Sequence, residues 1–95
     1  MKLINVKFHP EGDGCEALYV DGRCVLHGDE YHDKIQVRIE GFVEGLNFFA
    51  GRVAALKLEP EVVNVPLARC RNIVEGGDQP PLKWPAKRYL PKESK

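Results

Sequence analysis

Residues 15–27 read CEALYVDGRCVLH, and this stretch decides the fold that the sequence predicts. Two largely apolar runs flank the pair Asp21-Gly22, which is a strong signal for a two-residue β-hairpin turn. Upstream, residues 3–9 (LINVKFH) alternate apolar and polar side chains, as a half-buried strand does. The first part of the chain therefore predicts a small sheet built around a hairpin.

A two-residue turn fixes which residues of the hairpin face one another. On the face that we expect to join the core, Tyr19 pairs with Cys24 and Ala17 pairs with Leu26. The opposite face is apolar in its middle and charged at its ends, which favours a contact surface. Its expected pairs are Val20 with Arg23, Leu18 with Val25, and Glu16 with His27.

The segment after the hairpin, HGDEYHDK at residues 27–34, has the features of a helix start. Asp29 is a suitable N-cap, and Glu30 adds negative charge to the first turn and forms a favourable i,i+4 pair with Lys34. Apolar side chains then recur at helical spacing, which predicts one amphipathic helix from about residue 30 to about residue 50. The stripe that we expect to face the core is Tyr31, Ile35, Ile39, Phe42, Leu46, Phe49 and Val53.

The predicted fold class is α+β. Residues 53–58 and 61–65 favour two short strands, because they are rich in valine and Pro60 separates them. The expected architecture is a small antiparallel sheet, formed by the hairpin or meander and a later strand, packed on one long helix. Residues 1–66 would form this core domain, and residues 67–95 an extended, basic, proline-rich tail that is ordered only where it docks.

The composition is that of one small globular domain with a thin core, so assembly into a homo-oligomer would help its stability. No apolar run approaches the roughly 18–20 residues that span a bilayer, and the N-terminus has no secretory apolar segment. Cys15, Cys24 and Cys70 are odd in number and lack CxxC spacing, which indicates reduced thiols. We therefore expect a cytoplasmic protein.

The net charge of zero hides an asymmetry along the chain. Residues 80–95 carry five Lys and Arg against one Glu, which gives +4, and residues 1–79 carry nine against thirteen acids, which gives −4. A basic tail on an acidic body can dock on itself, on a neighbouring subunit or on a polyanion.

The two histidines of HGDEYHDK raise the alternatives of a metal site or a small hydrolase. His27 and His32, with Asp29 and Asp33, are proper ligand types, but no fixed metal-binding spacing such as HExxH is present. We therefore predict no metal, no cofactor and no catalytic residue. The positive end of the helix disfavours protonation of His32, so we expect a neutral imidazole there.

One face of the predicted helix carries cations at both ends and glycines in the middle. Glycine inside a helix costs roughly 1 kcal/mol relative to alanine, so some contact should compensate. Three explanations stay open: close approach of the protein's own sheet or tail, a subunit interface, or a groove for an anionic ligand. The residues of this face are Lys34, Arg38, Gly41, Gly45, Phe48 and Arg52.

The tail places Trp84 and Tyr89 among basic residues, including Arg88. Aromatic stacking combined with positive charge is typical of single-stranded nucleic-acid binding, and the same residues suit an arm that anchors on a partner protein. Upstream, Arg69 and Arg71 on either side of Cys70 look like an ordinary strand edge or loop.

Residues 17–46, ALYVDGRCVLHGDEYHDKIQVRIEGFVEGL, resemble small proteins of bacteria and their phages in which a D-G hairpin leads into a helix that opens on Tyr-His. The resemblance implies a protein that acts by binding, for example as an inhibitor of host defence or a sponge for nucleotide signals. If the protein is encoded by a phage, as the resemblance suggests, its expected location is the host cytoplasm. The resemblance assigns no residue roles.

The sequence thus predicts a non-catalytic, homo-oligomeric protein that captures a small anionic ligand, such as a nucleotide, at a subunit interface. The alternative is a single-stranded nucleic-acid or protein-binding module that uses the tail. No membrane contact is expected. The predicted ligand-binding residues are Tyr31, His32, Lys34, Arg38, Phe48, Arg52, Trp84, Arg88 and Tyr89.

Overall fold

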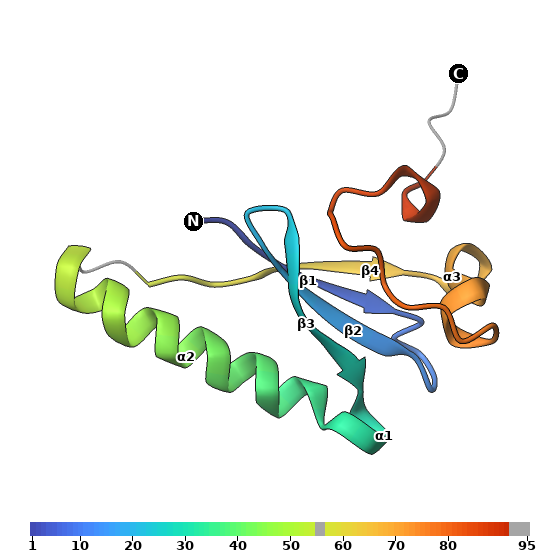
Figure 1. Cartoon of the computed structure of the whole chain (residues 1–95), viewed down its shortest axis with the longest axis horizontal. Coiled ribbons are helices and arrows are strands. Elements are labelled where there is room, and N and C mark those ends of the chain that lie inside the picture. The colour runs from blue at the N-terminus through green and yellow to red at the C-terminus, as the bar shows by residue number, and fades with distance from the viewer. Residues whose placement is uncertain (55–56, 92–95) are drawn as a thin grey trace.

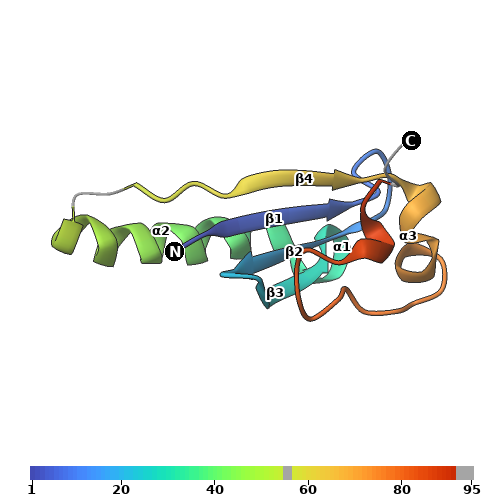
Figure 2. The ribbon, with the colours of Figure 1, turned by 90° about the horizontal axis from the view of Figure 1, so that it is seen from above.

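The fold is a four-stranded sheet with helical elements on both of its faces (Figures 1 and 2). The computed structural model describes the backbone of residues 1–54 and 57–91 and the side chains of residues 1–49 and 57–91. The strand order is β3-β2-β1-β4. The strands are β1 (Leu3–Phe8), β2 (Cys15–Val20), β3 (Arg23–Asp29) and β4 (Glu61–Val65).

The α+β class is confirmed, but the expectation of an all-antiparallel sheet is wrong at its last strand. The pairs β1–β2 and β2–β3 are antiparallel, whereas β4 pairs with β1 in parallel. A parallel neighbour needs a long crossover, and the helix that follows β3 provides it. The valine-rich segment 61–65 forms a strand as predicted, and residues 57–58 do not.

The hairpin turn has the predicted form, and its register changes within the hairpin. Asp21 and Gly22 both have positive φ, 48° and 84°, as a type I′ turn requires. Tyr19 faces Cys24 as expected, but a β-bulge then shifts the register so that Leu18 faces Leu26. The predicted pairs Ala17–Leu26, Leu18–Val25 and Glu16–His27 are therefore wrong. Because of the bulge, Cys24 packs against one face of the sheet and Leu26 against the other.

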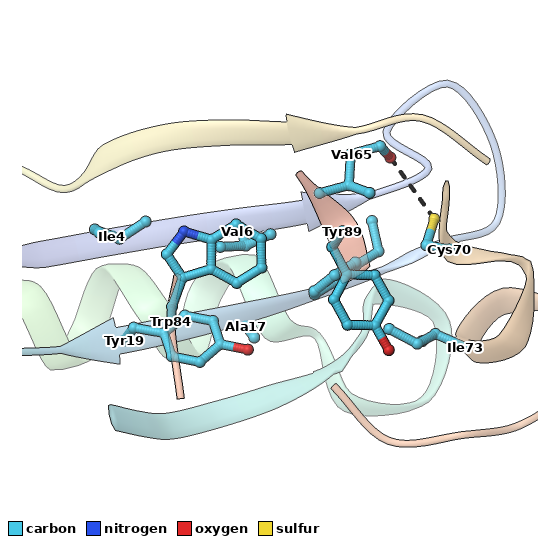
Figure 3. Close-up of a cluster of buried hydrophobic side chains, with 10 residues drawn as sticks. Ile4, Val6, Ala17, Tyr19, Val65, Cys70, Ile73, Trp84 and Tyr89 are labelled. Carbon is cyan, nitrogen blue, oxygen red and sulfur yellow. Dashed lines mark hydrogen bonds between the residues drawn. The ribbon is translucent and has the colours of Figure 1, made fainter. Parts of the chain in front are cut away.

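The C-terminal segment adds two aromatic side chains to the core on the first face of the sheet (Figure 3). Trp84 and Tyr89 are buried, and both rings meet Phe8 edge-on, with centroid distances of 6.3 and 5.6 Å. The Trp84 ring also lies against Tyr19, at 5.6 Å. The tail therefore docks on this protein's own sheet.

Backbone hydrogen bonds fix the same segment at the sheet edge. The Cys24 N–H donates to the Leu82 carbonyl at 2.9 Å, and the Trp84 N–H donates to the Gly22 carbonyl at 2.8 Å. The Tyr19 hydroxyl donates to the Pro81 carbonyl at 2.7 Å, and burial raises the pKa of that hydroxyl. The start of β3 is thus covered rather than exposed as a sheet edge.

Two helices replace the single helix predicted after the hairpin. They are α1 (Glu30–Asp33) and α2 (Ile35–Ala54), and they meet at Lys34, which has a left-handed backbone with φ 49°. On this second face of the sheet, Ile35 and Ile39 pack on Leu18 as part of the core. Leu18 is therefore buried rather than part of an outer contact surface.

The predicted core stripe holds only for part of α2. Ile35 and Ile39 are buried and Leu46 is half-buried, but Tyr31 is 91% exposed and Phe49 is 68% exposed. Phe42 is also partly exposed, and the side chain of Val53 lies outside the described residues. The break at Lys34 turns α1 away from the sheet, and the second half of α2 extends past the strands (Figure 1). The helix also continues to Ala54, where a strand was expected from residue 53.

A short helix, α3 (Leu67–Val74), follows β4 where the sequence was expected to loosen. Pro66 precedes α3 with an extended backbone, and the helix buries its own residues Cys70 and Ile73. The Cys70 thiol lies 3.3 Å from the Pro66 carbonyl and 3.7 Å from the Val65 carbonyl (Figure 3). A single-turn helix, η1 (Lys87–Tyr89), ends the described tail.

Removing the Trp84 ring should cost far more stability than removing an exposed apolar side chain from the same segment. Trp84→Ala should lower the free energy of unfolding by about 3–5 kcal/mol, since a large buried side chain leaves a cavity. Leu82→Ala is the matched control, because Leu82 is 82% exposed and should change little. Urea denaturation measures both, and equal effects would contradict the docking of the tail.

Candidate functional site

An open cleft of about 720 Å³ lies between α3 and η1. Four cationic side chains line the cleft, and all four are exposed. Its lining consists of Ala68, Arg69, Arg71, Asn72, Lys87, Arg88, Leu90 and Pro91.

The core determines where these cations point. In α3, Cys70 and Ile73 face inward, which leaves Arg69 and Arg71 on the solvent side. In η1, Tyr89 is buried against Phe8, which leaves Lys87 and Arg88 outside. The two elements are joined by a hydrogen bond of 2.9 Å from the Asn72 amide to the Tyr89 hydroxyl. Because Cys70, Ile73 and Tyr89 are buried, cations from two separate segments are left on the solvent side, where they line one cleft.

The cations of the cleft are only partly neutralised by the protein. Arg71 forms an ion pair with Glu75, at 3.0 Å and one helical turn away. Within residues 1–49 and 57–91, no ion pair involves Arg69, Lys87 or Arg88. The Arg88 guanidinium instead lies 5.7 Å from the centre of the Tyr89 ring. Three cations that share one cleft repel one another, and a bound anion would relieve that repulsion.

The sequence analysis identified Arg88 but missed Arg69, Arg71 and Lys87 as site residues. A signal for α3 was present, because Leu67, Cys70 and Val74 recur at helical spacing directly after a proline. A helix with that apolar side turned inward places Arg69 and Arg71 outside. Arg88 is exposed, whereas the other two predicted residues of the tail, Trp84 and Tyr89, are buried and present no stacking surface.

The glycine face of α2 is open rather than packed. A Cβ atom added at Gly41 or at Gly45 would meet nothing within 4 Å. Among the described residues, neither the sheet nor the tail packs on these glycines, so the structure gives no support to the explanation that they make room for the protein's own sheet or tail. Arg38 and Phe48 are exposed on the same helix, and the side chain of Arg52 lies outside the described residues.

The segment HGDEYHDK has a structural role in the fold. Asp29 caps α1 by accepting a hydrogen bond from the His32 N–H, and the Asp29 N–H donates to the Asp33 carboxylate at 3.0 Å. Glu30 accepts from the N–H of Gln36 at 3.1 Å, across the break between the helices. Tyr31 lies beside the His32 ring and is exposed.

The Asp29 carboxylate controls the charge of His32. The His32 Nδ1 atom lies 3.0 Å from an Asp29 oxygen, and this hydrogen bond raises the pKa of His32. The bonds from the His32 backbone and ring in turn lower the pKa of Asp29. The expectation that the positive end of the helix lowers the pKa of His32 is therefore wrong, because the pKa is raised. A four-residue helix has only a weak dipole, and the adjacent carboxylate outweighs it.

The three cysteines have raised pKa values, the opposite of what a reactive thiol requires. Burial raises the pKa of Cys15 to about 11 and also raises the pKa values of Cys24 and Cys70, which keeps these thiols protonated at neutral pH. In the part of the chain that the structure describes, no three His, Cys, Asp or Glu side chains gather as metal ligands would.

The chain matches no protein-family model, and neither a curated protein nor a solved structure is significantly similar to it. The resemblance to small phage proteins therefore stays a prediction. Among the described residues, no helix combines the length and the apolar character that crossing a membrane requires.

The contact between His32 and Asp29 can be tested by titration. In an NMR titration the pKa of His32 should lie above the usual value of about 6.5, and Asp29→Asn should bring it back toward that value. Because the folded pKa is raised, this contact stabilises the fold below the unfolded pKa, and its contribution is lost as pH rises through the folded pKa. A pKa that does not respond to Asp29→Asn would contradict the contact.

Proposed function

We propose that this protein is a non-catalytic binding protein that captures small phosphate-bearing anions in the cleft between α3 and η1. The observation that carries the proposal is the presence of Arg69, Lys87 and Arg88 in one cleft without an ion pair to any described residue. Arginine is well suited to phosphate, because its planar guanidinium donates two parallel hydrogen bonds. Asn72 forms part of the cleft wall, and its amide is held by hydrogen bonds to the Tyr89 hydroxyl at 2.9 Å and the Asp78 carboxylate at 3.2 Å.

The lining of the cleft supports recognition of phosphate groups rather than of a base. Its volume of about 720 Å³ is typical of small-molecule sites. Its apolar lining consists of Ala68, Leu90 and Pro91, and none of the lining residues is aromatic. Without a ring on which a base can stack, a nucleotide would bind mainly through its phosphates. We therefore expect little discrimination among the bases of nucleoside triphosphates.

This site differs from the one predicted on the Lys34, Arg38 and Arg52 face of the helix. The proposed ligand is still a small anion, as predicted, and Arg88, one of the predicted binding residues, lines the cleft. The predicted alternative, a tail that binds single-stranded nucleic acid, loses its stacking component because Trp84 and Tyr89 are buried. The cytoplasmic location and the role as a sponge for nucleotide signals stay predictions.

The proposal predicts binding that depends on phosphate charge and on the cations of the cleft. Inorganic triphosphate, ATP and CTP should bind with similar affinity in isothermal titration calorimetry. Arg69→Ala or Lys87→Ala should each raise the dissociation constant about tenfold, which is about 1.4 kcal/mol, since one charge-assisted contact is lost. The control is Lys57→Ala, which removes the same charge from an exposed residue outside the cleft.

Two results would reject the proposal. The first is the absence of heat from any phosphate compound at low salt, where charge interactions are strongest. The second is an equal loss of affinity in Lys57→Ala, which would indicate general attraction to positive charge. A labelled single-stranded oligonucleotide that binds far more tightly than triphosphate, with a steep dependence on salt, would instead support the nucleic-acid alternative.

A further inference from the structure

The outer face of α2 carries large apolar side chains that are exposed in the described structure. Val37 is 64% exposed, and Phe48 and Phe49 are 60% and 68% exposed. The two phenylalanine rings contact each other edge to face, with their centroids 5.7 Å apart. They lie in the half of α2 that extends past the strands, where the sheet provides no cover (Figure 1). Large exposed apolar groups gathered on one element of a small protein indicate a contact surface.

Two glycines in the middle of this face leave its backbone accessible. Gly41 and Gly45 are one helical turn apart, and the space beyond each is open. Glycine lowers helix stability, and no contact with a described residue requires it at these positions. A second helix that crosses here could approach the backbone closely, as helices do over glycines spaced by four residues. The apolar rings and the glycines therefore point to a helix as the partner.

The face is complementary to itself when a second copy runs in the opposite direction. Arg38 and Phe49 are eleven positions apart (49 − 38), which is close to three helical turns, so they lie on one side of the glycines at opposite ends. Val37 and Phe48 have the same separation (48 − 37) and lie on the other side. When two antiparallel helices cross midway between Gly41 and Gly45, Arg38 of one helix lies opposite Phe49 of the other. Val37 of one helix likewise lies opposite Phe48 of the other.

We propose that this protein forms a two-fold symmetric dimer through α2, with the two helices antiparallel. Arg38 of each copy then lies over the exposed ring of Phe49 in the other copy, which is a favourable cation–π contact. Val37 packs on the ring of Phe48 in the same way, and Gly41 of one helix meets Gly45 of the other. A parallel arrangement is less favourable, because it would place Arg38 opposite the aliphatic side chain of Val37 and not opposite an aromatic ring. A contact between identical patches is the usual form of a dimer interface.

The contact is large enough for a weak dimer. The exposed parts of Val37, Phe42, Phe48 and Phe49 amount to roughly 400 Å² in each copy, given the 150–250 Å² of a whole aromatic side chain. A standard interface covers about 800 Å² in each partner, to which Arg38 and the exposed helix backbone also contribute. We therefore expect a dissociation constant in the micromolar range. The dimer does not depend on the anion cleft, which lies on α3 and η1.

Sedimentation velocity over a concentration series tests the proposal on the full chain. The wild-type protein should change from the 10.7 kDa monomer to twice that mass as its concentration rises into the high micromolar range. Gly45→Leu should abolish the change, because a leucine side chain keeps the helices apart while meeting open space in the monomer. Circular dichroism confirms that the variant is folded. Glu40→Leu is the matched control, since Glu40 belongs to the side of α2 that lines a cleft with Ile39 and Leu58.

A double-mutant cycle tests the antiparallel arrangement. Arg38→Ala and Phe49→Ala should each raise the dissociation constant of the dimer several-fold. The double variant should raise it by less than the product of the two single effects, since both substitutions remove the same contact. A wild-type protein that stays monomeric at millimolar concentration would overturn the proposal, and so would a dimer that Gly45→Leu leaves intact. Independent effects of Arg38→Ala and Phe49→Ala would overturn the antiparallel arrangement.

Discussion

The packing of Trp84 and Tyr89 on Phe8 is the contact on which the rest of the architecture depends. It brings a proline-rich segment with little regular structure onto the sheet, where its backbone covers the start of β3. A chain of this length has few apolar side chains to bury, so two large rings are a substantial part of its core. The same burial determines which neighbours face solvent. Because Tyr89 points inward, Lys87 and Arg88 point outward, beside the arginines of α3.

The parts of the fold that follow from local signals could be predicted from the sequence. The Asp21-Gly22 turn, the strand at residues 61–65 and the helical spacing of Ile35 and Ile39 each depend on neighbouring residues. The bulge in the hairpin could not be predicted, since a strand pattern does not show where an extra residue is accommodated by packing on both faces. The break at Lys34 was equally hidden, because lysine rarely adopts a left-handed backbone and here the contacts of Glu30 and Asp29 support it.

The sequence named only one residue of the candidate cleft. Arg88 was predicted to bind a ligand because the tail is basic, and its side chain is exposed in the structure, but charge alone cannot show that Trp84 and Tyr89 turn inward. Whether an aromatic ring serves as a core residue or as a binding surface depends on contacts with distant strands, which a single sequence does not contain. Recognition of α3 would have shown Arg69 and Arg71 as a solvent-facing pair.

The central claim is that packing of the C-terminal aromatic residues assembles an anion-binding cleft from α3 and η1. Mapping of backbone amide shifts by NMR during titration with inorganic triphosphate tests it most directly. The account predicts that the largest shifts fall in two separate segments, residues 68–72 and 87–90, and that both change with the same midpoint. Shifts confined to residues 34–49 of the helical face, or different midpoints for the two segments, would contradict it.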